Sequence, residues 1–134
     1  MKFLYPTLFI ILLSFVGCNT NKTSNLDKPI ENKMAFEPDE NGEYDIIVMD
    51  PQYEIYLKTI ANPQSFNSHE YYKTKNRIFA TIWNQRHSNP LAYNPDLYAV
   101  SIDLDPQIEY GEEFEYKLFN FFKFIEWKYR VRLI

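Results

Sequence analysis

The sequence predicts a small single domain of the α+β class, with the element order β-α-α-β-α-β and helices packed on a short sheet. Two observations support this class. Apolar residues recur every three or four positions in three segments, as in helices, and alternate in other short segments, as in strands. Aromatic residues make up 18% of the 134 residues, and buried aromatic rings can build a core without disulfide bonds.

The first strand and the first helix are expected to follow each other directly. Residues 44–49 form a run rich in β-branched side chains, which is typical of a strand. Asp50-Pro51 ends this run, since aspartate is a good helix N-cap and proline is favoured at the first helical position. The short helix that follows is expected to end near Asn62-Pro63.

The second helix and the second strand are predicted from two different periods. Asn67 and Glu70 have the spacing of a capping box, and apolar residues then recur at helical spacing to about His87. Residues 98–104 alternate between apolar and mostly polar side chains, which is the pattern of a half-buried strand. Pro106 is expected to end that strand.

A third helix is predicted after Gly111, and a terminal strand after it. The helix has a wide apolar arc, which indicates burial on more than one side, and we expect Phe122 to be buried there. Val131 and Leu133 alternate with arginine residues, which predicts the terminal strand.

The chain divides into three parts by composition. Lys2 precedes an apolar run that ends at Gly17-Cys18, and the run is short for a membrane-spanning helix, which needs about 20 residues. Residues 18–42 are polar and poor in aromatic residues, as in a flexible tether. Residues 43–134 hold most of the aromatic residues and are expected to form the globular domain.

The end of the apolar run, Phe15-Val16-Gly17-Cys18, resembles the lipobox of bacterial lipoproteins. This resemblance implies a signal peptide over residues 1–17 and a lipidated Cys18 at the mature N-terminus. Two or more acyl chains anchor a protein stably, whereas one does so only marginally. No acidic cluster follows Cys18, and by resemblance to envelope lipoproteins we place the domain at the outer membrane, facing the periplasm.

A series of short motifs occurs in one order within the domain: Trp83-Asn84-x-Arg86-His87, Asn89-Pro90-Leu91, Ile102-Asp103-x-Asp105-Pro106, Tyr110-Gly111, Tyr116-Lys117-Leu118 and Phe124-Ile125-Glu126. In these motifs the stretch from Tyr44 to the C-terminus resembles a family of small uncharacterised bacterial lipoproteins, a domain of unknown function. The resemblance implies the lipoprotein architecture and no particular chemistry.

Composition excludes several function classes. The net charge is −4 and no run of basic residues is present, so nucleic-acid binding is not expected. Three glycines do not allow the common nucleotide-binding loops. One cysteine allows neither an intramolecular disulfide nor a multi-cysteine zinc site. We expect no cofactor and no metal.

Two groups of polar residues are candidate binding residues. Trp83, Asn84, Arg86 and His87 lie near the end of the second helix, where they would either bind a carboxylate or phosphate or cap the last carbonyl groups.

Asp103 and Asp105 share one face of the predicted strand. They would either hold Ca²⁺ or Mg²⁺ or, as we expect, lie at the surface and pair with Arg130 or Arg132 on a neighbouring strand.

Together these observations predict a lipid-anchored envelope protein whose domain binds or scaffolds an envelope protein or a glycan, without catalysis. The numerous tyrosines either form an exposed platform for sugar rings or belong to the core, and an exposed cluster of three or more would favour the platform. The alternative is an envelope hydrolase that uses His87 with Asp103 or Asp105. A pocket that brings His87 close to a carboxylate would favour this alternative.

Overall fold

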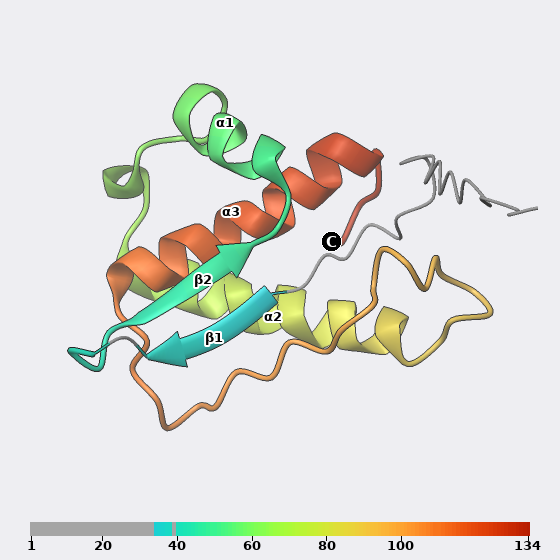
Figure 1. Ribbon diagram of the computed structural model, residues 1–134, viewed down its shortest axis with the longest axis horizontal. Coiled ribbons are helices and arrows are strands. Elements are labelled where there is room, and N and C mark those ends of the chain that lie inside the picture. The colour runs from blue at the N-terminus through green and yellow to red at the C-terminus, as the bar shows by residue number, and fades with distance from the viewer. Residues whose placement is uncertain (1–33, 39) are drawn as a thin grey trace, which may run out of the picture.

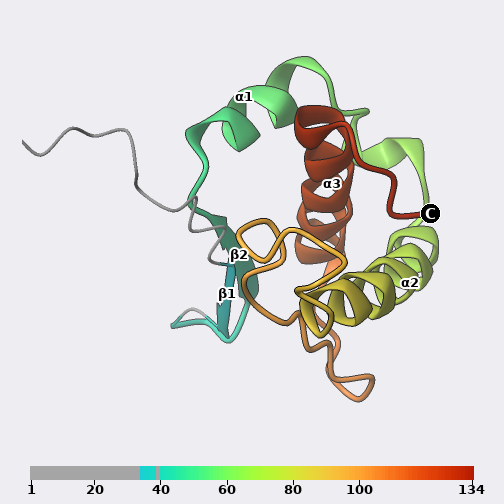
Figure 2. The same cartoon turned by 90° about the vertical axis from the view of Figure 1, so that its right-hand side faces the viewer.

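The computed structural model describes residues 34–38 and 40–134. Its elements are, in chain order, β1 (Met34–Pro38), β2 (Tyr44–Val48), α1 (Pro51–Thr59), the short 3₁₀ helix η1 (Gln64–Phe66), α2 (His69–His87) and α3 (Glu112–Tyr129). The hairpin, α1 and α2 lie around the central helix α3 (Figures 1 and 2). The prediction of a small domain that mixes helices and strands is therefore confirmed.

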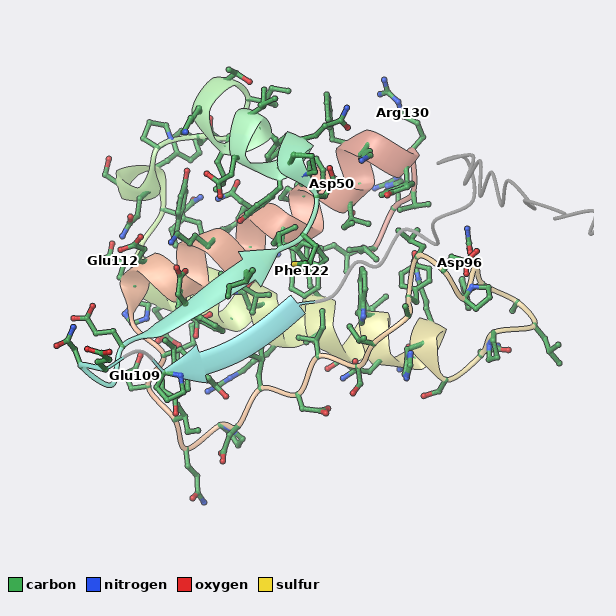
Figure 3. The ribbon with its side chains drawn as sticks, viewed as in Figure 1. Asp50, Asp96, Glu109, Glu112, Phe122 and Arg130 are labelled. Carbon is green, nitrogen blue, oxygen red and sulfur yellow. The ribbon has the colours of Figure 1, made fainter. Side chains whose placement is uncertain are left out.

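The core is built around α3, which is buried against several elements at once. Its buried apolar side chains are Phe114, Leu118, Phe121, Phe122, Phe124 and Ile125. Phe122 is fully buried, as predicted, and stacks on Phe79 of α2 with 5.1 Å between the ring centroids. Figure 3 shows Phe122 between the hairpin and the helices. The wide apolar arc of this helix is explained by its central position.

The only sheet in the described part of the chain is the antiparallel hairpin of β1 and β2, in which Met34 pairs with Val48 and Pro38 with Tyr44. In β2, Ile46 points into the core and Ile47 points to solvent, which follows the period of a strand. Gly42 in the connection has a φ of +79°, which glycine adopts without strain. The hairpin begins at residue 34, inside the segment 18–42 that was expected to be a tether.

The first turns of α1 and α2 follow the predicted capping chemistry with one change. The Asp50 side chain accepts a hydrogen bond from the Gln52 amide at 3.0 Å, and Pro51 is the first helical residue, as predicted. Asp50 also pairs with Lys128, which joins the start of α1 to the end of α3 (Figure 3). In α2 the cap is Ser68, whose hydroxyl accepts from the Tyr71 amide, instead of the expected pair of Asn67 and Glu70.

The strand predicted over residues 98–104 is absent. The alternation of side chains is nonetheless present, since Tyr98 and Ile102 are buried while Ser101 and Asp103 are exposed. The backbone of this segment runs along α2 and receives its hydrogen bonds from helix side chains, as described below. Alternation indicates which side chains face the core, but it does not indicate that a neighbouring strand supplies the backbone partners.

The predicted terminal strand is absent for the same reason. Leu133 is buried, but its amide donates to the Glu126 carboxylate at 2.7 Å, and the carbonyl of Arg132 accepts from the Arg86 guanidinium at 2.6 Å. Arg130 has a φ of 56° at the C-cap of α3, where the chain changes direction. The order β-α-α-β-α-β is therefore wrong in its last two strands, and the predicted three-stranded sheet does not form: the described residues hold one two-stranded hairpin.

The predicted signal peptide, residues 1–17, and the lipidation residue Cys18 lie outside the described residues. None of the helices in the described part has the length and apolar composition that crossing a membrane requires.

Candidate functional site

The first two candidate residues, Trp83 and Asn84, hold the segment after α2 in place. The Trp83 side chain is fully buried, and its indole N–H donates to the Val100 carbonyl at 2.7 Å. The Asn84 amide donates to the Ile102 carbonyl at 2.9 Å and accepts from the Ile102 amide at 2.8 Å. Asn84 therefore satisfies both backbone groups of Ile102, as a neighbouring strand residue would.

Arg86 and His87 continue this row of contacts at the end of α2. The Arg86 guanidinium donates to the Tyr98 hydroxyl at 2.8 Å. The guanidinium carbon Cζ also lies 5.1 Å from the centroid of the Tyr93 ring, which is a cation–π contact. His87 places its Nδ1 2.6 Å from the Tyr98 carbonyl. A carbonyl only accepts hydrogen bonds, so this nitrogen carries the proton. Arg86 therefore binds the loop and the C-terminal segment, and His87 binds the loop.

Asp103 and Asp105 lie at the surface, as predicted, but without the predicted partners. Asp103 accepts a hydrogen bond from the Ser101 hydroxyl at 3.0 Å, and Asp105 accepts one from the Gln107 amide at 2.8 Å. Neither carboxylate forms an ion pair with Arg130, Arg132 or another residue of the described ranges. The predicted pairing fails because the C-terminal segment folds back on α3 instead of lying beside residues 98–104.

A groove between α2 and residues 102–106 brings together part of the candidate set. It has a volume of about 550 Å³, and its lining includes Asn84, Asp103 and Asp105 together with Arg77 and Thr81 of α2. Its apolar lining comes from Ala80, Ile102, Leu104 and Pro106. Trp83, Arg86 and His87 do not line it. This volume lies within the range of about 300–1,000 Å³ that is usual for ligand sites.

The groove presents charges of both signs on fixed walls. Arg77 is exposed and makes no ion pair within the described ranges, and the two aspartates lie on the other wall. Asn84 fixes Ile102, and the Tyr110 hydroxyl accepts from the Asp105 amide at 2.9 Å, so both ends of the second wall are held. A ligand with separated positive and negative groups and some apolar surface fits such a lining.

A buried polar pair lies between α2 and α3, outside this groove. The Asn76 amide donates to the backbone carbonyl of Glu115 at 2.8 Å and to its carboxylate at 2.6 Å. Burial raises the pKa of the Glu115 carboxyl, and the hydrogen bond from Asn76 opposes this rise. The Oδ1 atom of Asn76 is buried without a hydrogen-bond partner. These hydrogen bonds join α2 to α3, while the Oδ1 atom of Asn76 remains a buried acceptor without a hydrogen bond.

Glu109 lies near this pair at the surface, where Figure 3 shows it beyond the start of α3. Its carboxylate lies 2.6 Å from the Lys73 ammonium and 3.3 Å from the His69 ring. The hydrogen bond from Lys73 lowers the pKa of the Glu109 carboxyl. These contacts are those of an exposed ion pair. The described residues contain no cluster of three or more His, Cys, Asp or Glu side chains that would hold a metal ion.

Arg77 is the groove residue that sequence reasoning missed. In the sequence it is one of several charged residues on the exposed face of a helix. Only the packing of residues 102–106 beside α2 places it opposite two carboxylates. The pair of aspartates was recognisable from their spacing, but no signal in the sequence joined them to this arginine.

The structure defines a small mixed helix-and-strand domain with a groove between α2 and residues 102–106. The chain belongs to a family of unknown function, DUF6146, which it matches over residues 5–134. The expected membership of an uncharacterised domain family is thereby confirmed. No curated protein and no solved structure matches the chain.

Proposed function

We propose that this protein is a lipid-anchored lipoprotein of the bacterial cell envelope whose domain binds an envelope partner without catalysis. The observation that carries the binding function is the groove, whose lining combines Arg77 with Asp103, Asp105 and apolar side chains. Because these three charges are not paired with one another, a partner segment that carries both signs of charge would satisfy them. An extended segment of an envelope protein has this chemistry.

The membrane anchor is supported by the sequence. The apolar run that ends at Gly17-Cys18, followed by a polar stretch, has the layout of a lipoprotein signal. The lipid on Cys18 would tether the domain to the outer membrane, facing the periplasm. Tethering would confine the groove to the partners within reach of the membrane and raise their effective concentration.

The positions of the candidate residues favour binding over the alternative of an envelope hydrolase. That mechanism needs His87 beside Asp103 or Asp105. The His87 ring is bonded to the Tyr98 carbonyl, and the two aspartates accept from Ser101 and Gln107. His87 is also not part of the groove lining.

The groove is tested by site-specific photo-crosslinking in cells that express the full-length chain. A photoreactive residue at Thr81, which lines the groove, should capture a partner on illumination. The same residue at Lys58, which is exposed on α1, is the matched control and should not capture it. Arg77→Ala and the double change Asp103→Asn with Asp105→Asn should abolish the Thr81 product. Capture that survives both changes, or that occurs equally at Lys58, contradicts the proposal.

The anchor is tested separately by cell fractionation. Cys18→Ser should release the protein from the membrane or leave an uncleaved precursor. Wild-type protein in the soluble fraction with an unmodified Cys18 thiol contradicts lipidation. Digestion of the domain by protease added to intact cells contradicts the periplasmic placement.

A further inference from the structure

A second hollow, away from the groove, is lined by residues of α1, of the loop with η1, of the start of α2 and of α3. Its volume is about 200 Å³, which is below the range of about 300–1,000 Å³ for complete ligand sites. It therefore accommodates one ring or one side chain of a larger molecule.

The walls of this hollow are aromatic. Phe66 of η1 is 65% exposed and makes no ring contact with another described residue. Tyr71 and Phe119 lie beside it in the lining, with 5.9 Å between their ring centroids. Aromatic surfaces of this kind receive the C–H face of a flat or ring-shaped ligand. In the sequence, an exposed cluster of three or more tyrosines is taken as the sign of a glycan platform. The hollow does not meet that criterion, since of these three residues only Phe66 and Tyr71 are exposed and Phe119 is partly buried.

The remaining lining includes three side-chain amides. Asn62, Asn67 and Asn120 contribute to it from three different segments. Asn120 is 4% exposed, and its amide nitrogen donates to the Tyr116 carbonyl at 2.9 Å. Its Oδ1 accepts no hydrogen bond from a described residue and, unlike Asn76 Oδ1, is not fully buried. An acceptor that solvent can reach is able to take a hydrogen bond from a ligand that enters the hollow.

The hollow is preformed, because two tyrosine hydroxyls form hydrogen bonds with the backbone of the loop between α1 and α2, which lines it. The Tyr72 hydroxyl donates to the Gln64 carbonyl at 3.1 Å, and the Tyr116 hydroxyl donates to the Asn62 carbonyl at 2.9 Å. These bonds join α2 and α3 to the segment that carries Phe66. A preformed site loses less conformational entropy on binding.

The charge of the site is close to neutral. The only ionisable cation in the lining is Lys123, which pairs with Glu126. An anionic ligand would therefore compete with a carboxylate. An apolar side chain would offer these amides no hydrogen bonds. A neutral ring with both donors and acceptors at its edge satisfies aromatic and amide groups together.

We propose that this hollow binds one N-acetylated sugar ring of an envelope glycan. The ring's C–H face would lie against Phe66, and its acetamido N–H and hydroxyl groups would meet the asparagine amides. The acetamido group supplies a donor, an acceptor and a methyl group, and Ile60, which is half exposed in the lining, would contact the methyl group. This site is independent of the groove and of its partner.

The test uses the full-length chain in detergent and measures saturation-transfer NMR and affinity with chitotetraose, a soluble oligomer of N-acetylglucosamine. Cellotetraose, which has the same backbone without acetamido groups, is the matched ligand. Chitotetraose should bind and cellotetraose should bind at least about tenfold more weakly, because a site built for hydrogen bonds rejects an analogue that lacks them. Phe66→Ala should weaken chitotetraose binding about tenfold.

The control variant is Ile78→Ala, which removes another exposed apolar side chain of 41% exposure and lies outside the hollow. It should bind chitotetraose as the wild type does. Absence of chitotetraose binding at millimolar concentration, or unchanged affinity in Phe66→Ala, overturns the proposal. Equal binding of cellotetraose overturns the assignment of an acetamido sugar. Saturation transfer to a leucine- and phenylalanine-rich peptide but to neither sugar assigns the hollow to a protein partner and also overturns it.

Discussion

Two extended regions of this protein satisfy their backbones in different ways. In the hairpin, β1 and β2 exchange backbone hydrogen bonds with each other. Residues 98–104 have the same alternation of buried and exposed side chains, but their backbone partners are the side chains of Trp83, Asn84 and His87. The comparison shows that a half-buried extended segment needs a source of donors and acceptors, and that a helix surface with suitable side chains supplies them.

The difference has a consequence for stability. A strand pair loses little when one side chain changes, because its hydrogen bonds are made by the backbone. The segment of residues 98–104 depends on a few particular side chains, so single substitutions on α2 should loosen it. The motif Trp83-Asn84-x-Arg86-His87 is therefore explained in large part by this structural task.

The largest expected effect comes from the core that both regions share. Phe122→Ala should lower the free energy of unfolding by about 3–5 kcal/mol, because the ring is fully buried and leaves a cavity. Chemical denaturation followed by tryptophan fluorescence measures this loss, and the hairpin and residues 98–104 should unfold together. Phe66→Ala, at an exposed ring, is the control and should cost about 0.5 kcal/mol or less. A loss below about 1 kcal/mol for Phe122→Ala would contradict its central position.

The second effect separates the two regions. Asn84→Ala should lower stability by about 1–3 kcal/mol, because it leaves the amide and the carbonyl of Ile102 without partners. Amide hydrogen exchange should become faster at Ile102, while β2 should change only as far as global stability does. Gln85→Ala, at the exposed neighbouring residue, should change neither. Equal acceleration in β2 and at Ile102 would show that the segment is not held separately.

A third prediction concerns the other asparagine of α2 that binds backbone, Asn76. Burial raises the pKa of its partner Glu115, so the folded state binds this proton more tightly than the unfolded state. The resulting stabilisation is complete below the ordinary pKa of glutamate, 4.5, and is lost as the pH rises through the folded-state pKa. Glu115→Gln should therefore be more stable than the wild type at pH 7, and this advantage should shrink toward pH 4.

Thermal unfolding at a series of pH values measures this difference. Glu112→Gln, which changes an exposed acid at the start of α3 (Figure 3), should not show the same advantage. Glu109 changes the stability with pH in the opposite direction. The pKa of its carboxyl is lowered in the folded state, so its contribution to stability is lost as the pH falls. This exposed group titrates in both variants alike. A Glu115→Gln variant that loses stability at pH 7 would refute the assignment.

The smallest change in stability is expected at the exposed aspartates of the segment after α2, Asp103 and Asp105. Asp103→Asn with Asp105→Asn removes two exposed carboxylates that form no ion pair with the described residues, so stability should change by less than about 1 kcal/mol. Added Ca²⁺ should not raise the melting temperature of the wild type. A rise of several degrees that disappears in the Asp103→Asn variant would instead indicate a metal site.

Much of the local structure was predictable because it depends on neighbours in the chain. The start of α1 follows from Asp50 and Pro51, and the burial of Phe122 follows from its place in the apolar arc of α3. The candidate site was predictable in part: Asn84, Asp103 and Asp105 line the groove, while Trp83 is buried and Arg86 and His87 bind the protein's own loops. Side-chain spacing identified polar residues but not what they contact.

By itself, the sequence determined where the helices run and which side of each extended segment turns inward, because periodicity reflects the exposure of successive side chains to water. Only the tertiary structure decided that α2 would replace a strand as the partner of residues 98–104. It also placed Arg77 opposite two aspartates and enclosed the hollow beside Phe66. These features join residues far apart in the chain, and their hydrogen bonds depend on the packing of whole elements around α3, which no local pattern of residues encodes.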